Sequence, residues 1–416
     1  MLIKDTATPV VVLNCKLGAL SIMRSLGSLG IKTVGVDADR HSPGMLSRYC
    51  QRKFYRDLDE NNPQALVEYL LDVGKQIGGR SILIPTSDET SVFVAEYQDA
   101  LNEFYIFPQN SPDLVKQLMS KKGMYQLALD NNIPTPLTRF PQNLEDVKAY
   151  VDQAIFPVML KGILGNRLQQ RTGKKMVIVN SADELISNYR LLEDPEEPNL
   201  MLQECIPGGD DEVYIFNGYF DSNSECLSPF TGHKIRQFPI HVGCASLGAC
   251  VWNKDVAMIT TDFMKTIGYR GILDIGYRLD PRDGKYKVLD INPRIGQAFR
   301  MFVSEDDLDV ARDLYLDLTG QDRYPAVPRE GRRWLIEDFD IISSIDYFRE
   351  GSLTFKEWLR SFRGVQEGLW FSSNDPWPFI RMSVRLLGRA VASVFRRIGP
   401  RKKTAVPVAL QKVPGV

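Results

Sequence analysis

The segment spanning residues 269–300 constrains the fold of this chain more than any other part of it. Residues 271–279 and 286–291 are rich in β-branched and aromatic side chains, and residues 280–284 read Asp-Pro-Arg-Asp-Gly, which is typical of a turn. The pattern predicts a β-hairpin. Because side chains alternate between the two faces of a strand, Asp290 and Asn292 should share one face, as should Asp274 and Gly276 on the partner strand.

That face carries oxygen ligands suited to a hard cation. Mg²⁺ usually takes one or two protein carboxylates and fills its other positions with phosphate oxygens and water. Arg294, two residues beyond Asn292, has a planar guanidinium that can hold a phosphoryl or carboxylate oxygen. The spacing alone is equally compatible with an ordinary surface hairpin that has a solvated acidic turn.

The motif DINPR at the end of the second strand, preceded by YRG, resembles the metal-binding end of the ATP-grasp superfamily. Two further motifs, QECIPGGDDEVYIF and FTGHKIRQFP, make the order most similar to carboxylate-amine ligases of the D-aspartate ligase and short carbamoyl-phosphate-synthetase-like type. The similarity covers about residues 9–320. It implies ATP and Mg²⁺ as cofactors, with Mn²⁺ as an alternative metal. The metal would be held by Asp290, Asn292 and, from a shifted position, Asp274.

The resemblance also implies which residues bind the nucleotide and which act on it. The triphosphate would be held by Lys121 and Lys161, and the adenosine by the hinge residues Gln203, Glu204, Ile206 and Glu212, with Asp211 as the alternative to Glu212 at the ribose. The transferring phosphoryl group would be held by Lys234, Arg236 and Arg294.

The activity implied by the family is an ADP-forming ligation. A small-molecule carboxylate attacks the γ-phosphate of ATP to give an acyl phosphate, and an amine then displaces phosphate to form an amide. Gly276 stands where relatives have a metal carboxylate, which leaves open a nucleotide-binding regulatory or scaffold protein with little turnover. A carboxylase-like enzyme that phosphorylates bicarbonate is the third hypothesis. The loop after Lys161 contains four basic residues, which indicate either a mobile lid over the triphosphate or a solvated loop.

At 416 residues the chain is too long for one compact domain. We expect an α/β chain with a βαβ pre-ATP-grasp domain at residues 1–111, a two-subdomain α+β ATP-grasp domain at residues 112–322 that divides near residue 200, and a helical extension at residues 323–416. The sequence SDE at residues 87–89 follows an apolar run, where α/β sheets bind ligands. Ser87 and Asp88 are therefore candidates for substrate contact, or they only cap the next helix.

Composition excludes several other classes of protein. A net charge of -1 gives no bulk attraction for nucleic acid, and six cysteines without close pairs, with only three histidines, disfavour a zinc site. Reduced thiols, and an N-terminus without a basic and apolar leader, predict a cytoplasmic protein.

Residues 377–403 predict a basic amphipathic helix. Its apolar stripe comprises Ile380, Val384, Leu387, Val391, Val394, Phe395 and Ile398, with arginines outside it and no acidic residue between Arg381 and Lys403. Such a helix either lies on the inner membrane surface or docks its apolar face on the protein body or on a second subunit in a homodimer.

Overall fold

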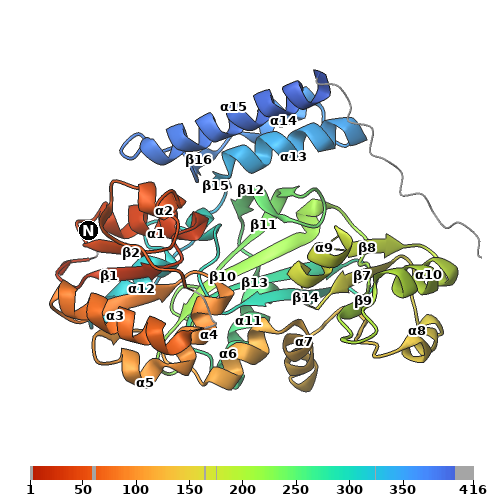
Figure 1. Ribbon diagram of the computed structural model, residues 1–416, viewed down its shortest axis with the longest axis horizontal. Coiled ribbons are helices and arrows are strands. Elements are labelled where there is room, and N and C mark those ends of the chain that lie inside the picture. The colour runs from red at the N-terminus through yellow and green to blue at the C-terminus, as the bar shows by residue number, and fades with distance from the viewer. Residues whose placement is uncertain (1–2, 59–61, 164, 175, 324, 399–416) are drawn as a thin grey trace, which may run out of the picture.

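The computed structural model describes residues 3–58, 62–163, 165–174, 176–323 and 325–398 (Figure 1). Three sheets organise these residues. A parallel sheet lies at the N-terminal end, a small antiparallel sheet lies at the opposite end, and a larger sheet lies between them.

The N-terminal layer is a parallel sheet in the order β3-β2-β1-β4-β5. Its strands are β1 (Val10–Leu13), β2 (Thr33–Val36), β3 (Cys50–Phe54), β4 (Ser81–Pro85) and β5 (Tyr105–Ile106). Its helices are α1 (Leu17–Gly27), α2 (Pro43–Leu46), α3 (Pro63–Ile77), α4 (Asp88–Glu96) and α5 (Gln98–Leu101). β1 reads VVVL and is buried throughout, as expected of a strand covered on both faces. The βαβ unit expected at the start of the chain is therefore present.

The small sheet has the order β6-β9-β7-β8, with antiparallel neighbours. Its strands are β6 (Thr138–Arg139), β7 (Val158–Gly162), β8 (Met176–Val179) and β9 (Leu200–Glu204), and its helices are α8 (Leu144–Val151), α9 (Gly165–Thr172) and α10 (Ala182–Leu192). In β7, Val158 and Leu160 join the core formed with α8 and α10. Since side chains alternate along a strand, Lys161 projects from the other face.

The large sheet has the order β14-β13-β10-β11-β12-β15-β16. Its strands are β10 (Val213–Phe220), β11 (Phe230–Phe238), β12 (Cys244–Cys250), β13 (Gly271–Asp280), β14 (Lys285–Asn292), β15 (Arg333–Leu335) and β16 (Val365–Gly368). The helices around it are α6 (Pro112–Met119), α7 (Lys121–Asp130), α11 (Lys254–Thr266) and α12 (Val310–Leu318), and the short helices are η1 (Asp210–Glu212) and η2 (Phe299–Met301).

The predicted hairpin is β13 and β14. Leu273, Ile275 and Tyr277 share a hydrophobic core with residues of α7 and α11, so the intervening residues face the other side of the sheet. On that side Asp274 lies opposite Asn292, and Gly276 lies opposite Asp290. The sheet therefore presents the predicted metal-binding face, as the alternation of the sequence indicated.

The C-terminal extension is less purely helical than expected. It contains α13 (Glu337–Glu350), α14 (Phe355–Ser361) and α15 (Trp377–Ile398), and it also adds β15 and β16 to the edge of the large sheet. Residues 333–335 pair with β12 and so cover an otherwise open sheet edge.

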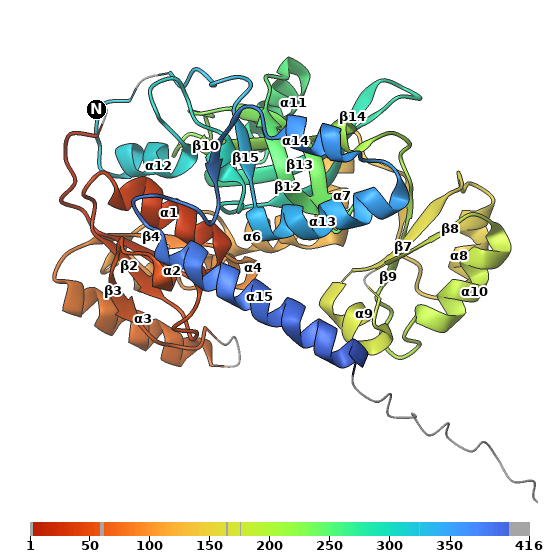
Figure 2. The ribbon, with the colours of Figure 1, turned by 90° about the horizontal axis from the view of Figure 1, so that it is seen from above.

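Helix α15 docks through a face that the sequence analysis did not single out (Figure 2). Phe379, Met382 and Leu386 pack against the hydrophobic core of the body. The described part of the predicted stripe points outward, since Ile380, Val384 and Leu387 are 45%, 58% and 65% exposed. The side chains of residues 389–398, and all of residues 399–403, lie outside the described part of the chain.

Asp375 fixes the start of α15 on the N-terminal layer. Its buried carboxylate accepts hydrogen bonds from the Arg24 guanidinium (3.0 Å), from the Ser47 hydroxyl (2.7 Å) and from the Arg48 N–H (2.9 Å). Across the described residues, no helix is both long and apolar enough to cross a membrane.

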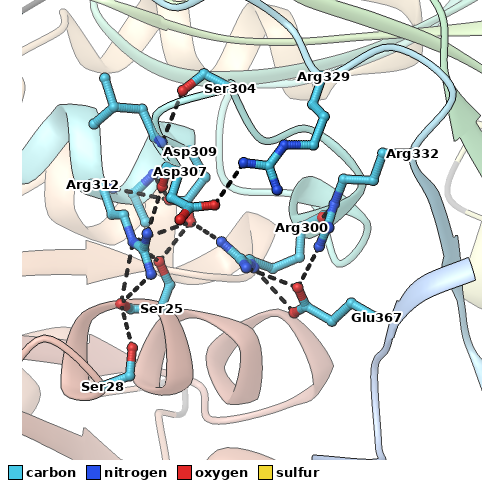
Figure 3. Close-up of polar contacts among 12 residues, drawn as sticks. Ser25, Ser28, Arg300, Ser304, Asp307, Asp309, Arg312, Arg329, Arg332 and Glu367 are labelled. Atoms are coloured by element: carbon cyan, nitrogen blue, oxygen red, sulfur yellow. Dashed lines mark hydrogen bonds and ion pairs between the residues drawn. The ribbon is translucent and has the colours of Figure 1, made fainter. Parts of the chain in front are cut away.

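A buried ionic seam joins all three parts of the chain (Figure 3). Asp309, at the start of α12, has no exposed surface and accepts from the Arg300 guanidinium and from the Ser25 hydroxyl of α1, each at 2.6 Å. Arg300 also binds Glu367 of β16 at 2.8 Å. Although burial alone would raise the pKa of Asp309, the charges of Arg300 and Arg312 hold it below its ordinary value.

We predict that Asp309→Asn lowers the free energy of unfolding by about 3–5 kcal/mol, because it removes a buried counter-charge from two arginines while an amide can still cap α12. Urea unfolding would measure the change. The matched control is Asp307→Asn, which removes an exposed carboxylate paired with Arg329 and should cost under about 1 kcal/mol. Equal losses for the two variants would contradict a special role for the seam.

Candidate functional site

The candidate site lies between the small and large sheets, and three lysines from separate elements surround Asp290. Lys121 begins α7, Lys161 lies on β7 and Lys234 lies on β11. Burial lowers the pKa of each lysine, and the charge of Asp290 opposes this shift in all three. The shared influence of Asp290 indicates that the lysines converge on one region.

Neutral oxygens hold the first two lysines in place. The Lys161 ammonium donates to the Gln203 side chain of β9 at 2.8 Å, and Gln203 in turn donates to the Thr138 hydroxyl at 2.9 Å. Lys121 donates to the Gly162 carbonyl at 3.0 Å. Because burial and the charge of Lys121 act together, the pKa of Lys161 falls to about 8. Gln203 therefore positions Lys161, one of the two lysines predicted to bind the triphosphate.

The predicted metal ligands lie on the site face of the hairpin. The Asn292 amide donates to Asp290 at 3.2 Å, and burial raises the pKa of Asp274 to about 6 against the opposing charge of Arg294. A side chain at Gly296 would collide with the Asp274 carboxylate, since a Cβ there would lie 2.2 Å from Oδ2. The described residues contain no cluster of three or more His, Cys, Asp or Glu side chains arranged for a metal ion. The oxygen set thus fits Mg²⁺ that takes most of its ligands from phosphate and water.

Gly276 leaves open space beside these ligands. A Cβ built at this position would meet no heavy atom within 4 Å. Asn217 of β10, which lies opposite Asp274, has a buried side-chain oxygen without a hydrogen-bond partner. The structure therefore has open space at Gly276, and it places Asp274 opposite Asn292 on the neighbouring strand.

The hinge residues divide between structural and nucleotide-facing groups. The Glu204 carboxylate accepts from the Leu137 N–H, from Arg282 (2.8 Å) and from Lys287 (3.1 Å), so it ties the small sheet to the hairpin. Ile206 is buried. In contrast, Glu212 has a buried carboxylate oxygen without a partner.

Arg278 lies on the same face of β13 as Asp274 and Gly276, where alternation predicts it, although no role was predicted for it. It follows Gly276 by two residues on the same strand face, donates to the Gly208 carbonyl at 2.5 Å, and has a buried Nε without a partner. Unpaired buried polar atoms are costly. Their presence at Arg278 and Glu212 is consistent with a ligand at the hinge, and the alternation along β13 was the signal that could have identified Arg278.

Lys234 and Arg236 are not brought together, which differs from the expectation that both reach the phosphoryl group. A β-bulge places two residues of β11 against one of β12 between these positions, so the two side chains leave opposite faces. The Arg236 guanidinium binds Asp340 of α13 through two contacts, at 2.7 and 3.0 Å, and is buried. This ion pair attaches the C-terminal extension to the large sheet.

Arg294 connects the site to the N-terminal layer. Its Nε donates to the Asp88 carboxylate at 2.5 Å and its terminal nitrogen donates to the Asn292 oxygen at 3.1 Å. Ser87 caps α4, which is one of the two roles predicted for it, whereas Asp88 binds Arg294.

The basic loop after Lys161 forms α9, in which Arg167 is bound by Asp194 at 2.7 Å and Glu197 at 2.6 Å. Lys175 lies outside the described residues.

Comparison with known proteins agrees with this geometry, although no family model matches the chain. A D-aspartate ligase from Enterococcus faecium (strain Aus0004) is 26% identical over 243 residues, which cover 56% of this chain and 57% of that protein. The chain thus matches little more than half the length of this curated relative.

Solved structures share the fold. N5-carboxyaminoimidazole synthetase from Staphylococcus aureus complexed with ADP has a TM-score of 0.61 at 12% identity, covering 79% of this chain and 81% of that one. L-amino acid ligase from Bacillus licheniformis has a TM-score of 0.58 at 15% identity, covering 79% of each chain. The biotin carboxylase domain of Hydrogenobacter thermophilus 2-oxoglutarate carboxylase, solved with MgADP and bicarbonate, has a TM-score of 0.59 at 16% identity, covering 78% and 73%. The resemblance found in the sequence is confirmed, and the chain has the ATP-grasp fold.

Proposed function

We propose that this chain is an ATP-dependent ligase that activates a small carboxylate as an acyl phosphate and joins it to an amine, releasing ADP and phosphate. The observation that carries the proposal is the convergence of Lys121, Lys161 and Lys234 on Asp290 between two sheets. Such a site binds a triphosphate and offsets the charge that develops during phosphoryl transfer. The similarity to a D-aspartate ligase supports the choice of reaction.

The residues take the following parts in the proposed reaction. Bound Mg²⁺ would neutralise phosphate charge and would be held by Asp290, Asn292 and Asp274. Lys121 and Lys161 bind the triphosphate, and Glu212 binds the ribose. Lys234 and Arg294 hold the reacting carboxylate and the acyl phosphate formed from it, since both lie beside Asp274. Arg236 is left out because Asp340 already binds its guanidinium.

We also propose the organisation of the chain. Its parts are a pre-ATP-grasp domain at residues 1–111, an ATP-grasp domain at residues 112–322 that divides near residue 200, and an extension at residues 323–416. The extension completes the large sheet through β15 and β16, so it should fold together with the ATP-grasp domain.

Asp290→Asn should lower the rate of substrate-dependent ADP formation by about 100-fold or more, because it removes a charged metal ligand. The assay supplies Mg-ATP with pooled amino acids and small carboxylates and measures ADP and phosphate. Asp283→Asn, at the exposed turn of the same hairpin, is the matched control and should leave the rate unchanged. ATP binding by the wild type without turnover on any pool would instead favour the regulatory protein suggested by Gly276.

Nucleotide binding should take up a proton near pH 8. Free Lys161, with a pKa of about 8, is about half deprotonated there, and a bound triphosphate favours its charged form. Calorimetric titration in buffers of different ionisation enthalpy should give an uptake of about half a proton at pH 8 that disappears near pH 6.5. Lys161→Arg stays charged and should show no uptake. Uptake that persists in this variant would assign the proton to another group.

We further propose that α15 holds the protein at an anionic membrane surface on the cytoplasmic side. The helix presents Ile380, Val384 and Leu387 outward, Arg381 and Arg385 are exposed beside them, and the chain has no acidic residue after Asp375. Each basic residue near such a surface contributes about 1 kcal/mol.

Flotation with phosphatidylserine vesicles tests this surface. The wild type should float, and the triple variant Ile380→Ser, Val384→Ser, Leu387→Ser should not. The pair Ile341→Ser, Ile345→Ser on the exposed face of α13 serves as control and should float. A wild type that never binds vesicles, and that dimerises only with the stripe intact, would assign the surface to a homodimer.

A further inference from the structure

The turn between β11 and β12 holds Lys234 in place, and the turn is itself held from outside the site. The Lys234 ammonium donates to the Gly243 carbonyl at 2.8 Å and to the Gln237 side chain at 3.2 Å. Both partners are neutral oxygens that bracket residues 238–242. A side chain at Gly243 would collide with the Phe238 carbonyl, since a Cβ there would lie 2.0 Å from it. The turn therefore has one tight conformation, and the position of Lys234 depends on it.

Asp210, at the start of η1, connects this turn to the hinge. Its carboxylate accepts from the Gln237 amide at 2.9 Å and from the Tyr347 hydroxyl of α13. The Tyr347 oxygen in turn accepts from the Gln237 N–H at 3.1 Å. Gln237 is thus held on two sides, and Asp210 lies two residues before Glu212, a residue of the predicted hinge.

His241, at the tip of the turn, bridges two carboxylates. Its Nδ1 lies 3.1 Å from Asp210 and its Nε2 lies 2.9 Å from Glu350, the last residue of α13, while its ring packs edge-on against Tyr347 at 5.3 Å between centroids. A neutral imidazole has one N–H and can donate only once, so both contacts require the charged form. The titratable groups that face His241 are therefore Asp210, Glu350 and Tyr347.

We propose that His241, Asp210 and Glu350 are positioning residues, which fix the turn that holds Lys234 and so couple α13 of the C-terminal extension to the phosphoryl-transfer site. This inference rests on the proposed function for Lys234. Burial lowers the pKa of His241, but the two carboxylates outweigh burial and raise this pKa above its ordinary value. The bridge from His241 to Asp210 and Glu350, which we call the clamp, is therefore closed below that pKa and opens as the pH rises through it.

The test uses His241→Asn in the full chain. The backbone at residue 241 has a φ of 64°, which asparagine tolerates, so the substitution removes the bridge without straining the turn. We expect kcat for ADP formation to fall roughly 10- to 100-fold through misplacement of Lys234, and the Kd for MgADP to change by less than about twofold, because Lys121 and Lys161 are untouched. His41→Asn, on an exposed loop, is the control and should match the wild type.

Glu350→Gln provides a second variant that leaves the turn sequence intact. It should move the fall of kcat at high pH to a lower pH, because one of the two carboxylates that stabilise the imidazolium is lost.

Competitive acylation of Lys234, measured by mass spectrometry, should be faster in His241→Asn and Glu350→Gln than in the wild type. This labelling reports on the clamp even if the wild type shows no turnover, which would refute only the proposed function. Unchanged labelling in folded His241→Asn and Glu350→Gln would overturn the clamp.

Discussion

The buried carboxylate of Asp309 is the contact on which the assembly of this chain depends. A charge without exposed surface is stable only if its partners are all in place, and here those partners come from α1, from the segment after β14 and, through Arg300, from β16. Only one arrangement of the N-terminal layer, the large sheet and the extension satisfies them together.

The geometry of each strand decides which of its side chains face the candidate site and which hold the structure together. On β7 simple alternation buries Leu160 and leaves Lys161 facing the large sheet. On β11 alternation would place Lys234 and Arg236 on the same face, but the bulge between them turns Arg236 to the other face. Lys234 therefore faces the site, whereas Arg236 binds Asp340. Two basic residues that look equivalent in the sequence therefore have unrelated surroundings.

The C-terminal extension is attached to the site at more points than its position in the chain suggests. Arg236 with Asp340 fixes the beginning of α13, and Glu350 with His241 fixes its end. Asp375 fixes the start of α15 on the N-terminal layer. Helix α15 docks on the body through Phe379, Met382 and Leu386, and it leaves Ile380, Val384 and Leu387 exposed. The same helix can therefore dock on the body and also contact a membrane or a second subunit.

The sequence by itself determined the βαβ start, the β13–β14 hairpin and which residues share the face predicted to bind metal, because these depend on local periodicity and turn chemistry. The resemblance to the ATP-grasp superfamily also led to the prediction that Lys121, Lys161 and Gln203 bind the nucleotide, and the structure places Lys161 beside Gln203. Only the tertiary structure decided that the Glu204 carboxylate binds Arg282 and Lys287, that Arg236 faces away from Lys234, and that the stripe of α15 points outward. Each of these depends on a bulge or on a partner far away in the chain, and a local pattern of residues contains no information about either.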